Sequence, residues 1–103
     1  VTPDIDIIKT IDSQGVVITA AANERDLDFI SRYFGPQLGI DEDPVTGSAH
    51  CILAPIWAQK LNKTEFKAHQ ASQRGGDLTL SLQNNRVLIT GNATLYMEGT
   101  LYV

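Results

Sequence analysis

The first half of the chain alternates short apolar runs with polar segments. Apolar residues within 5–11, a polar glycine-containing turn at 12–15 and the apolar run 16–18 together predict a β-hairpin. Residues 26–34 fit both a helical face and strand-like alternation, so periodicity alone leaves that segment open. The stretch 39–47 contains several carboxylates, two glycines and a proline, and it is predicted to be a loop.

The clearest helical signal runs from Ser48 to about Leu61. Its apolar residues recur three and four positions apart, and small residues fill most of the remaining sides. Such a helix has no polar stripe for solvent, so we expect other elements to enclose it, with Cys51 as a small core residue. Pro55 costs this helix one backbone donor.

After this helix come four segments with alternating or β-branched character, separated by Gly and Asn pairs that are typical of turns. The predicted strands are 65–72, 77–82, 86–90 and 93–103. Strands, one helix and four further strands predict an α+β domain, in which a curled, barrel-like antiparallel sheet wraps around one central helix.

Composition limits the class of protein. The 103 residues, 43% of them hydrophobic, suffice for a single domain over 1–103 with one core. The 12 acidic and 8 basic side chains give a formal charge of -4, and no basic cluster is present, so nucleic acid is not an expected partner. No apolar run approaches the roughly 20 residues of a membrane-spanning helix, so no membrane partner is expected either.

The single cysteine and the absence of a signal-peptide pattern predict a cytoplasmic protein. The chain begins at Val1 and not at Met. We therefore expect it to be a piece of a longer protein.

The most informative stretch is 39–50, where carboxylates precede small residues at the start of the helix. Unpaired N–H groups and the positive end of the dipole at a helix start attract anions, and the small residues 47–49 leave room for a ligand. Pro44 restricts Asp43 to an extended backbone, which would hold its carboxylate near this position. The pattern indicates a site for a substrate carboxylate or phosphate beside Asp43.

Ordinary structural roles explain the same residues. Asp43 and Pro44 could be an N-cap and a first-turn proline, or Thr46 or Ser48 could cap the helix. The spacing by itself leaves these alternatives open.

A metal site is not expected. The acidic run 41–43 lacks the ligand spacing of a calcium-binding EF-hand loop. His50 and Cys51 are neighbours on a helix and point in different directions, so they are not expected to share a metal ion with His69.

The segment 70–76 is a second candidate, because Arg74 before Gly75-Gly76 could approach an anionic ligand with little steric hindrance. An exposed arginine in a strand-to-strand turn explains the segment more simply, and that explanation is favoured.

Ordered motifs cover most of the chain, among them EDPVTGSAH at 42–50 and QASQRGG at 70–76, together with 31–36, 39–40, 87–91 and Gly99. In combination they resemble the carboxyl-terminal half of the PhzF-like phenazine-biosynthesis family. The resemblance implies one half of a diaminopimelate-epimerase-like fold, in which two similar domains, each a curled sheet around a central helix, enclose the active site between them. It also favours a strand over 29–34.

The resemblance implies cofactor-independent isomerisation or epimerisation, by proton transfer at the carbon next to a substrate carboxylate. It assigns Asp43 as a catalytic residue, and Gly47 and Ser48, with the flanking Thr46 and Ala49, to substrate binding. Helix N–H donors would stabilise the charge that develops in the transition state, so no metal or cofactor is required.

The family's main acid-base group is a glutamate in an amino-terminal domain that has no counterpart in this chain. The resemblance therefore implies that the chain alone is inactive, and that its partners are a small carboxylate-containing substrate and either the missing domain or a second copy in a homodimer. The alternative hypothesis is a non-enzymatic, stand-alone domain that binds anions or self-associates.

Overall fold

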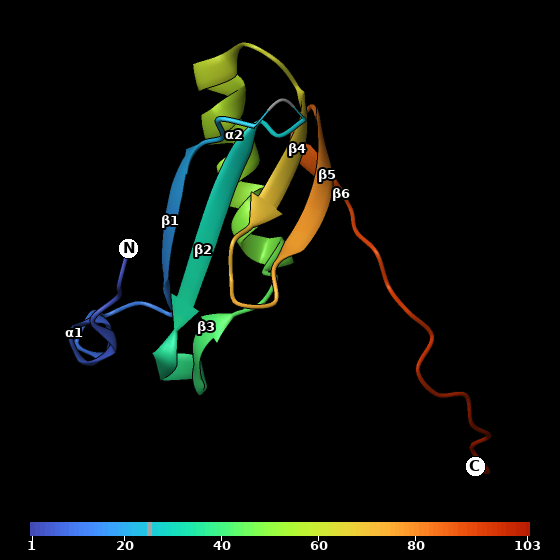
Figure 1. Cartoon of the computed structure of the whole chain (residues 1–103). Coiled ribbons are helices and arrows are strands. Elements are labelled where there is room, and N and C mark those ends of the chain that lie inside the picture. Colours follow the sequence, from blue (N-terminus) through green and yellow to red (C-terminus); the bar gives the residue numbers. More distant parts are fainter. Residues whose placement is uncertain (25) are drawn as a thin grey trace.

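A mixed β-sheet with one long helix against one of its faces forms the body of the protein (Figure 1). The structure is a computed structural model, and it describes residues 1–24 and 26–103. Its elements, in chain order, are α1 (Ile5–Lys9), β1 (Val16–Ala21), β2 (Phe29–Gly35), the short 3-10 helix η1 (Pro36–Leu38), β3 (Ile40–Asp43), α2 (Gly47–Leu61), β4 (Glu65–Gln70), β5 (Gly76–Gln83) and β6 (Arg86–Thr90).

The sheet has the strand order β1-β2-β4-β5-β6, and β3 pairs with β2. The predicted all-antiparallel sheet is wrong in one place, because β2 and β4 are parallel, with Phe29 opposite Ala68. The helix α2 returns the chain to the end of the sheet where β2 begins, and a strand that follows such a crossover runs parallel to the first. The sheet is therefore mixed.

The core lies between α2 and the sheet. Phe29 of β2 is fully buried, and its ring stacks on that of Trp57 with 5.3 Å between the ring centroids. Leu53 of α2 and Phe66 and Leu80 of the sheet belong to the same buried cluster. Along β4 the burial alternates, so that one face packs on α2 and the other carries exposed polar side chains.

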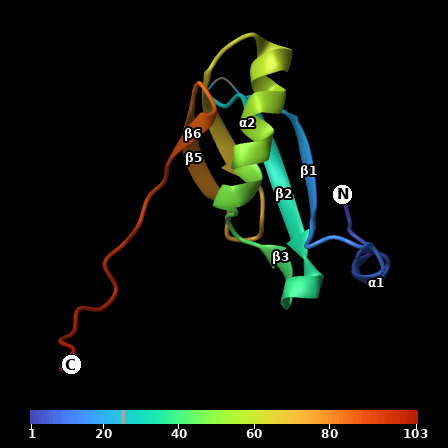
Figure 2. The same cartoon turned by 180° about the vertical axis from the view of Figure 1, so that it is seen from behind.

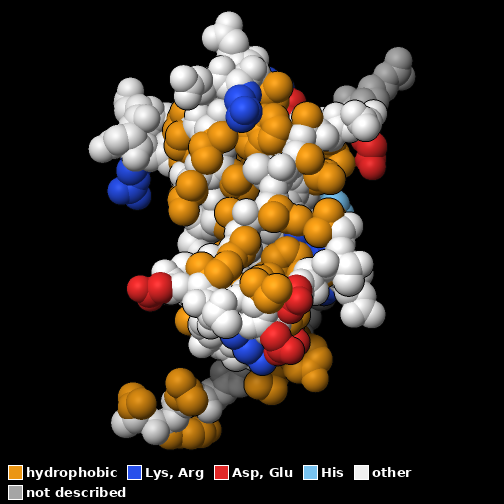
Figure 3. Space-filling model, turned by 90° about the vertical axis from the view of Figure 1, so that its left-hand side faces the viewer, with side chains coloured by type: hydrophobic (Ala, Val, Ile, Leu, Met, Phe, Trp, Pro, Cys, Tyr) orange, Lys and Arg blue, Asp and Glu red, His pale blue; other side chains and the backbone are white. Residues whose placement is uncertain are grey.

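The side of α2 that faces away from the sheet carries exposed apolar side chains. Ile52 is 62% exposed and Ile56 is 42% exposed, and Figure 2 shows α2 in front of the sheet. Cys51 is also exposed, so its predicted place in the core is wrong. The sheet covers only one side of the helix, so complete enclosure would require elements outside the described residues. Figure 3 shows further hydrophobic side chains spread over the side of the molecule on which β1 lies.

The predicted hairpin over 5–18 is wrong in its first half, because Ile5–Lys9 form the helix α1. The spacing of its apolar residues is also compatible with a helical turn, and Asp4 caps the helix by accepting a hydrogen bond from the Ile7 N–H at 3.1 Å. This cap favours the helix over a strand. The second half of the hairpin, β1, pairs instead with β2.

The strand predicted at 93–103 is also absent, and this segment runs away from the body of the protein without secondary structure (Figure 1). Its apolar side chains are exposed, including Tyr96 at 97% and Leu101 at 89%. A β-strand needs a neighbour for its backbone groups, and none of the described strands pairs with this segment.

The remaining predicted helix and strands are confirmed. The ambiguous segment 26–34 overlaps β2, which ends one residue later at Gly35, the helix begins one residue earlier than expected at Gly47, and β4, β5 and β6 lie within a few residues of the predicted strands. The predicted loop 39–47 is wrong at its start, because residues 40–43 pair with β2 and form the short strand β3.

Two neighbouring residues of α2 test this packing. Leu53 is 1% exposed, so Leu53→Ala should lower the free energy of unfolding by about 2–5 kcal/mol through lost burial and a cavity. Ile52→Ala, on the uncovered side, should lower it by less than about 1 kcal/mol. Urea denaturation of the two variants and the wild type measures both values. Equal losses would contradict the packing described above.

Candidate functional site

The site predicted from the loop lies where β3 ends and α2 begins. Thr46 is the N-cap residue of α2, but its side chain makes no capping hydrogen bond to the helix. Its hydroxyl instead donates to Oδ2 of Asp43 at 2.6 Å. Neither Asp43 nor Ser48 occupies the N-cap position, so the structural alternatives that assigned the cap to them are wrong.

The first turn of α2 is open to a ligand. Gly47 and Ser48 are exposed, and a Cβ atom at Gly47 would meet nothing within 4 Å. Because the Thr46 side chain does not cap the first turn, its N–H groups face outward with the positive end of the helix dipole. The other two predicted binding residues, Thr46 and Ala49, are only 9% and 5% exposed, so their side chains are buried and do not face a ligand in solvent.

Gln70 forms hydrogen bonds to both Asp43 and Thr46, where β3 ends and α2 begins. It is fully buried at the end of β4, and its Oε1 accepts a hydrogen bond from the Thr46 N–H at 2.7 Å. Its Nε2 donates to the Asp43 carbonyl at 2.9 Å. Our sequence reasoning assigned no role to Gln70. The available signal was its position, because it follows Phe66 and Ala68 on the buried face of an alternating strand.

His50 is buried one turn into α2. Its Nδ1 lies 2.8 Å from the Thr46 carbonyl oxygen, and its Nε2 lies 3.3 Å from the Ser31 hydroxyl of β2. A carbonyl can only accept, so Nδ1 carries the proton and Nε2 accepts from Ser31. Burial lowers the pKa of His50, although the hydrogen bond to Thr46 opposes this, and the ring is neutral at pH 7.

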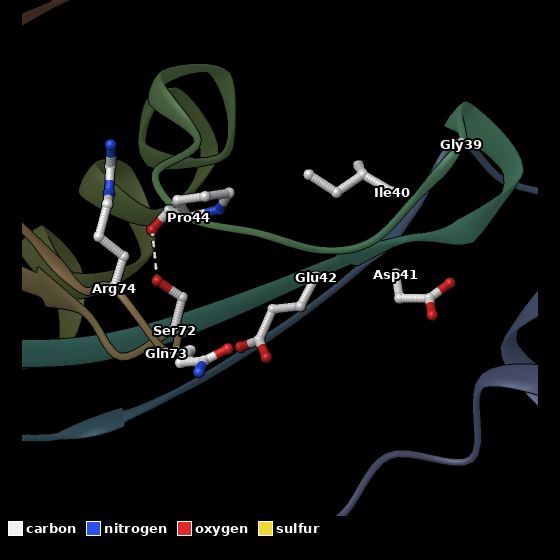
Figure 4. Close-up of a pocket in the computed structure, with 8 residues that line it drawn as sticks. All are labelled: Gly39, Ile40, Asp41, Glu42, Pro44, Ser72, Gln73 and Arg74. Carbon is white, nitrogen blue, oxygen red and sulfur yellow. Dashed lines mark hydrogen bonds between the residues drawn. The ribbon is translucent and has the colours of Figure 1, made fainter.

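An open pocket of about 760 Å³ lies beside the junction (Figure 4). Its lining combines the two motifs that the sequence presented separately, with Asp41, Glu42 and Pro44 from the first and Ser72 and Arg74 from the second. The Ser72 hydroxyl donates to the Pro44 carbonyl at 2.8 Å and so ties the two motifs together (Figure 4).

The charges around this pocket are only partly paired. Arg32 of β2 donates to both carboxylate oxygens of Glu42, at 2.8 and 3.0 Å. The hydrogen bonds to Glu42 raise the pKa of Arg32, and the ion pair links β3 to the neighbouring strand β2. Arg74 is exposed, as expected for a turn, but it faces the same pocket as the acidic loop.

The two glycines after Arg74 serve backbone geometry. Gly75 has a φ of +74°, in the left-handed region that favours glycine. A Cβ atom at Gly76 would collide with Val45, so β5 can approach the loop before α2 only without a side chain there. These roles need no bound anion.

The scan of known families places residues 1–99 within the model described as phenazine biosynthesis-like protein, PhzC-PhzF. The chain belongs to this family. The resemblance noted from the motifs is therefore confirmed.

Curated family members match almost the whole chain. An uncharacterized isomerase from Halalkalibacterium halodurans is 48% identical over 99 residues, which are 96% of this chain and 37% of that protein. A phenazine biosynthesis-like domain-containing protein from mouse is 47% identical over 92% of this chain and 35% of its own length.

Solved structures of the family agree with the fold. A PhzF-family phenazine biosynthesis protein from Enterococcus faecalis has a TM-score of 0.87 and 47% identity, over 99% of this chain and 39% of that one. A putative PhzC/PhzF protein from Clostridium difficile has a TM-score of 0.84 and 44% identity. The chain thus spans less than two fifths of the length of these PhzF-family proteins.

Within residues 1–24 and 26–103, no helix is long and apolar enough to span a membrane. Within the same residues, His, Cys, Asp and Glu side chains form no group of three or more that could hold a metal ion.

The neutral state of His50 makes stability depend on pH. Below its usual pKa of 6.5 the unfolded chain binds a proton before the folded chain does, so the free energy of unfolding should fall as the pH drops. The slope for one such group is at most about 1.4 kcal/mol per pH unit. His50→Gln should remove this contribution between about pH 6.5 and 5.5, and His69→Gln should retain it. Urea denaturation across this range measures the slopes, and identical slopes in the wild type and His50→Gln would contradict the neutral ring.

Proposed function

We propose that this chain is the carboxyl-terminal half of a cofactor-independent isomerase or epimerase that moves a proton at the carbon next to a substrate carboxylate. The observation that carries the proposal is the position of the Asp43 carboxylate, which is held at the uncapped N-terminus of α2 by the Thr46 hydroxyl. Relatives named isomerases support the reaction class.

Substrate binding falls to the first turn of α2. A substrate carboxylate that accepts hydrogen bonds from the N–H groups of Gly47 and Ser48 would be stabilised by the helix dipole. The same donors would stabilise the additional negative charge that the carboxylate gains when the neighbouring carbon loses its proton. Both residues are exposed, which leaves this approach open.

Asp43 would take part in the proton transfer. One base removes the proton from the carbon, the electron pair left behind is delocalised into the carboxylate, and an acid returns a proton to the same or a conjugated carbon. No net oxidation or reduction occurs. Asp43 suits one of these roles because it is half-buried and lies beside the anion site.

The second acid-base group would come from the missing amino-terminal domain, where the family resemblance places a glutamate. The chain spans 37–39% of relatives that match nearly all of it, and its α2 has an uncovered apolar side. Both observations support a domain that completes its active site against another part of a longer protein. The chain alone would leave Asp43 accessible to water and without its partner, and would be inactive.

Hydrogen exchange of a candidate substrate tests this proposal. The chain combined with the amino-terminal domain of a family member should catalyse loss of the α-proton signal of a small amino or hydroxy acid in D2O. Asp43→Asn should lower the rate by about 100-fold or more, because it removes the proton-transfer group but keeps the size of the side chain.

Asp6→Asn in α1 is the matched control and should leave the rate unchanged. Exchange catalysed by the chain without the second domain would contradict the view that it contains half of the active site. An Asp43→Asn variant as active as the control would remove Asp43 from the reaction.

A second candidate function is a non-enzymatic domain that binds anions and associates with itself through the uncovered side of α2. The exposure of Ile52 and Ile56 favours it. Sedimentation of the chain distinguishes the two candidates. Stable dimers that Ile56→Glu dissociates would favour self-association, and a monomer at high concentration would argue against it.

A further inference from the structure

Gln70 contacts the loop that carries Asp43 at both of its ends. Its side chain is fully buried, and a buried amide needs partners for its oxygen and its nitrogen. Oε1 accepts from the Thr46 N–H at 2.7 Å, and Nε2 donates to the Asp43 carbonyl at 2.9 Å and to the Thr46 hydroxyl oxygen at 3.1 Å. All three hydrogen bonds end on the first or last residue of the four-residue segment 43–46.

The chemistry of these partners fixes the direction of each hydrogen bond. A backbone N–H only donates and a backbone carbonyl only accepts, so Oε1 must face the Thr46 N–H and Nε2 must face the Asp43 carbonyl. One Nε2 hydrogen then points at the Thr46 hydroxyl oxygen, which acts as an acceptor. The single hydrogen of that hydroxyl is left for Oδ2 of Asp43, 2.6 Å away.

This chain of donors makes the two oxygens of Asp43 unequal. Oδ2 receives the Thr46 hydrogen, whereas Oδ1 has no hydrogen-bond partner in the described part of the chain. A carboxylate held through one oxygen has a defined orientation, and its other oxygen is left to accept a proton or a hydrogen bond from a ligand.

We propose that Gln70 is a positioning residue, which acts through the Thr46 hydroxyl to hold Asp43 by Oδ2 and to leave Oδ1 for the substrate. The effect on the reaction rests on the proposed function of Asp43. The hydrogen-bond chain itself does not, because it can be observed in the chain without any substrate.

Amide hydrogen exchange of the isotopically labelled chain tests the hydrogen bond between the Thr46 N–H and Gln70. The Thr46 amide should exchange slowly in the wild type, and Gln70→Leu should accelerate it by about tenfold or more while the amide of Leu80 in the core strand β5 keeps its rate. Gln83→Leu, at the exposed end of β5, is the matched control and should change neither rate. A Thr46 amide that exchanges freely in the wild type, or equal acceleration of both amides, would overturn the inference.

A second variant keeps the test valid if Gln70→Leu fails to fold. Thr46→Val removes the hydroxyl but leaves the backbone N–H at position 46, so the amide there should stay protected by Gln70. The kinetic test uses the two-domain protein, which is this chain combined with the amino-terminal domain of a family member. There, Thr46→Val should lower kcat by about tenfold or more and change KM by less than about twofold. Thr46→Ser, which keeps a hydroxyl, should retain most of the wild-type kcat. Thr79→Val, on the exposed face of β5, is the control for the loss of a hydroxyl.

The kinetic outcomes separate positioning from a merely structural role. A rise in KM with unchanged kcat, or a Thr46→Ser variant as impaired as Thr46→Val, would overturn the inference. If the wild-type two-domain protein catalyses no exchange at all, the proposed function fails, and the exchange rate of the Thr46 amide still decides whether Gln70 holds the loop.

Discussion

The start of α2 is anchored to the sheet by buried side chains that belong to three different elements. Gln70 at the end of β4 accepts a hydrogen bond from the Thr46 N–H. His50 of α2 donates to the Thr46 carbonyl, and its other ring nitrogen accepts from the Ser31 hydroxyl of β2. Buried polar groups are costly unless they are all paired, so these contacts admit few other positions for the helix. These buried hydrogen bonds therefore determine where the exposed first turn and the Asp43 carboxylate lie.

The structure leaves large apolar side chains exposed on α2 and in the segment after β6. The sheet covers one side of α2, and the opposite side carries exposed isoleucines where a helix at a surface would carry polar residues. The segment after β6 exposes large apolar side chains as well. In a family whose members are more than twice as long, these surfaces support a domain that is completed by another part of the protein. An active site at the first turn of α2 would then lie at the boundary between this domain and that other part.

The sequence predicted the elements whose signals come from burial within this chain. The alternation of β4 and β5 and the recurrence of Ala49, Leu53 and Trp57 in α2 arise from side chains that are buried within this chain, so the sequence predicts these elements directly. The segments 5–11 and 93–103 were misassigned because short apolar patterns do not distinguish a helical turn from a strand, or a paired strand from an unpaired one. Cys51 was placed in the core because the sequence cannot show how much of a helix the rest of the chain covers.

The candidate site was also predictable only in part. The neighbourhood of Asp43 and the helix start was predictable because they are close in sequence, and Pro44 limits the backbone between them. Gln70 lies 24 residues from Thr46, and only the register of β4 brings the two together. The contribution of Arg74 to the same pocket as the acidic loop likewise depends on the turn after β4, which Ser72 ties to Pro44.

The most direct measurement is a crystal structure of this chain joined to the amino-terminal domain of a family member, with a small carboxylate inhibitor bound. The account predicts that the inhibitor carboxylate accepts hydrogen bonds from the N–H groups of Gly47 and Ser48, with Oδ1 of Asp43 facing the carbon next to it. A carboxylate bound instead by Arg74 in the neighbouring pocket, with the first turn of α2 free, would contradict the account.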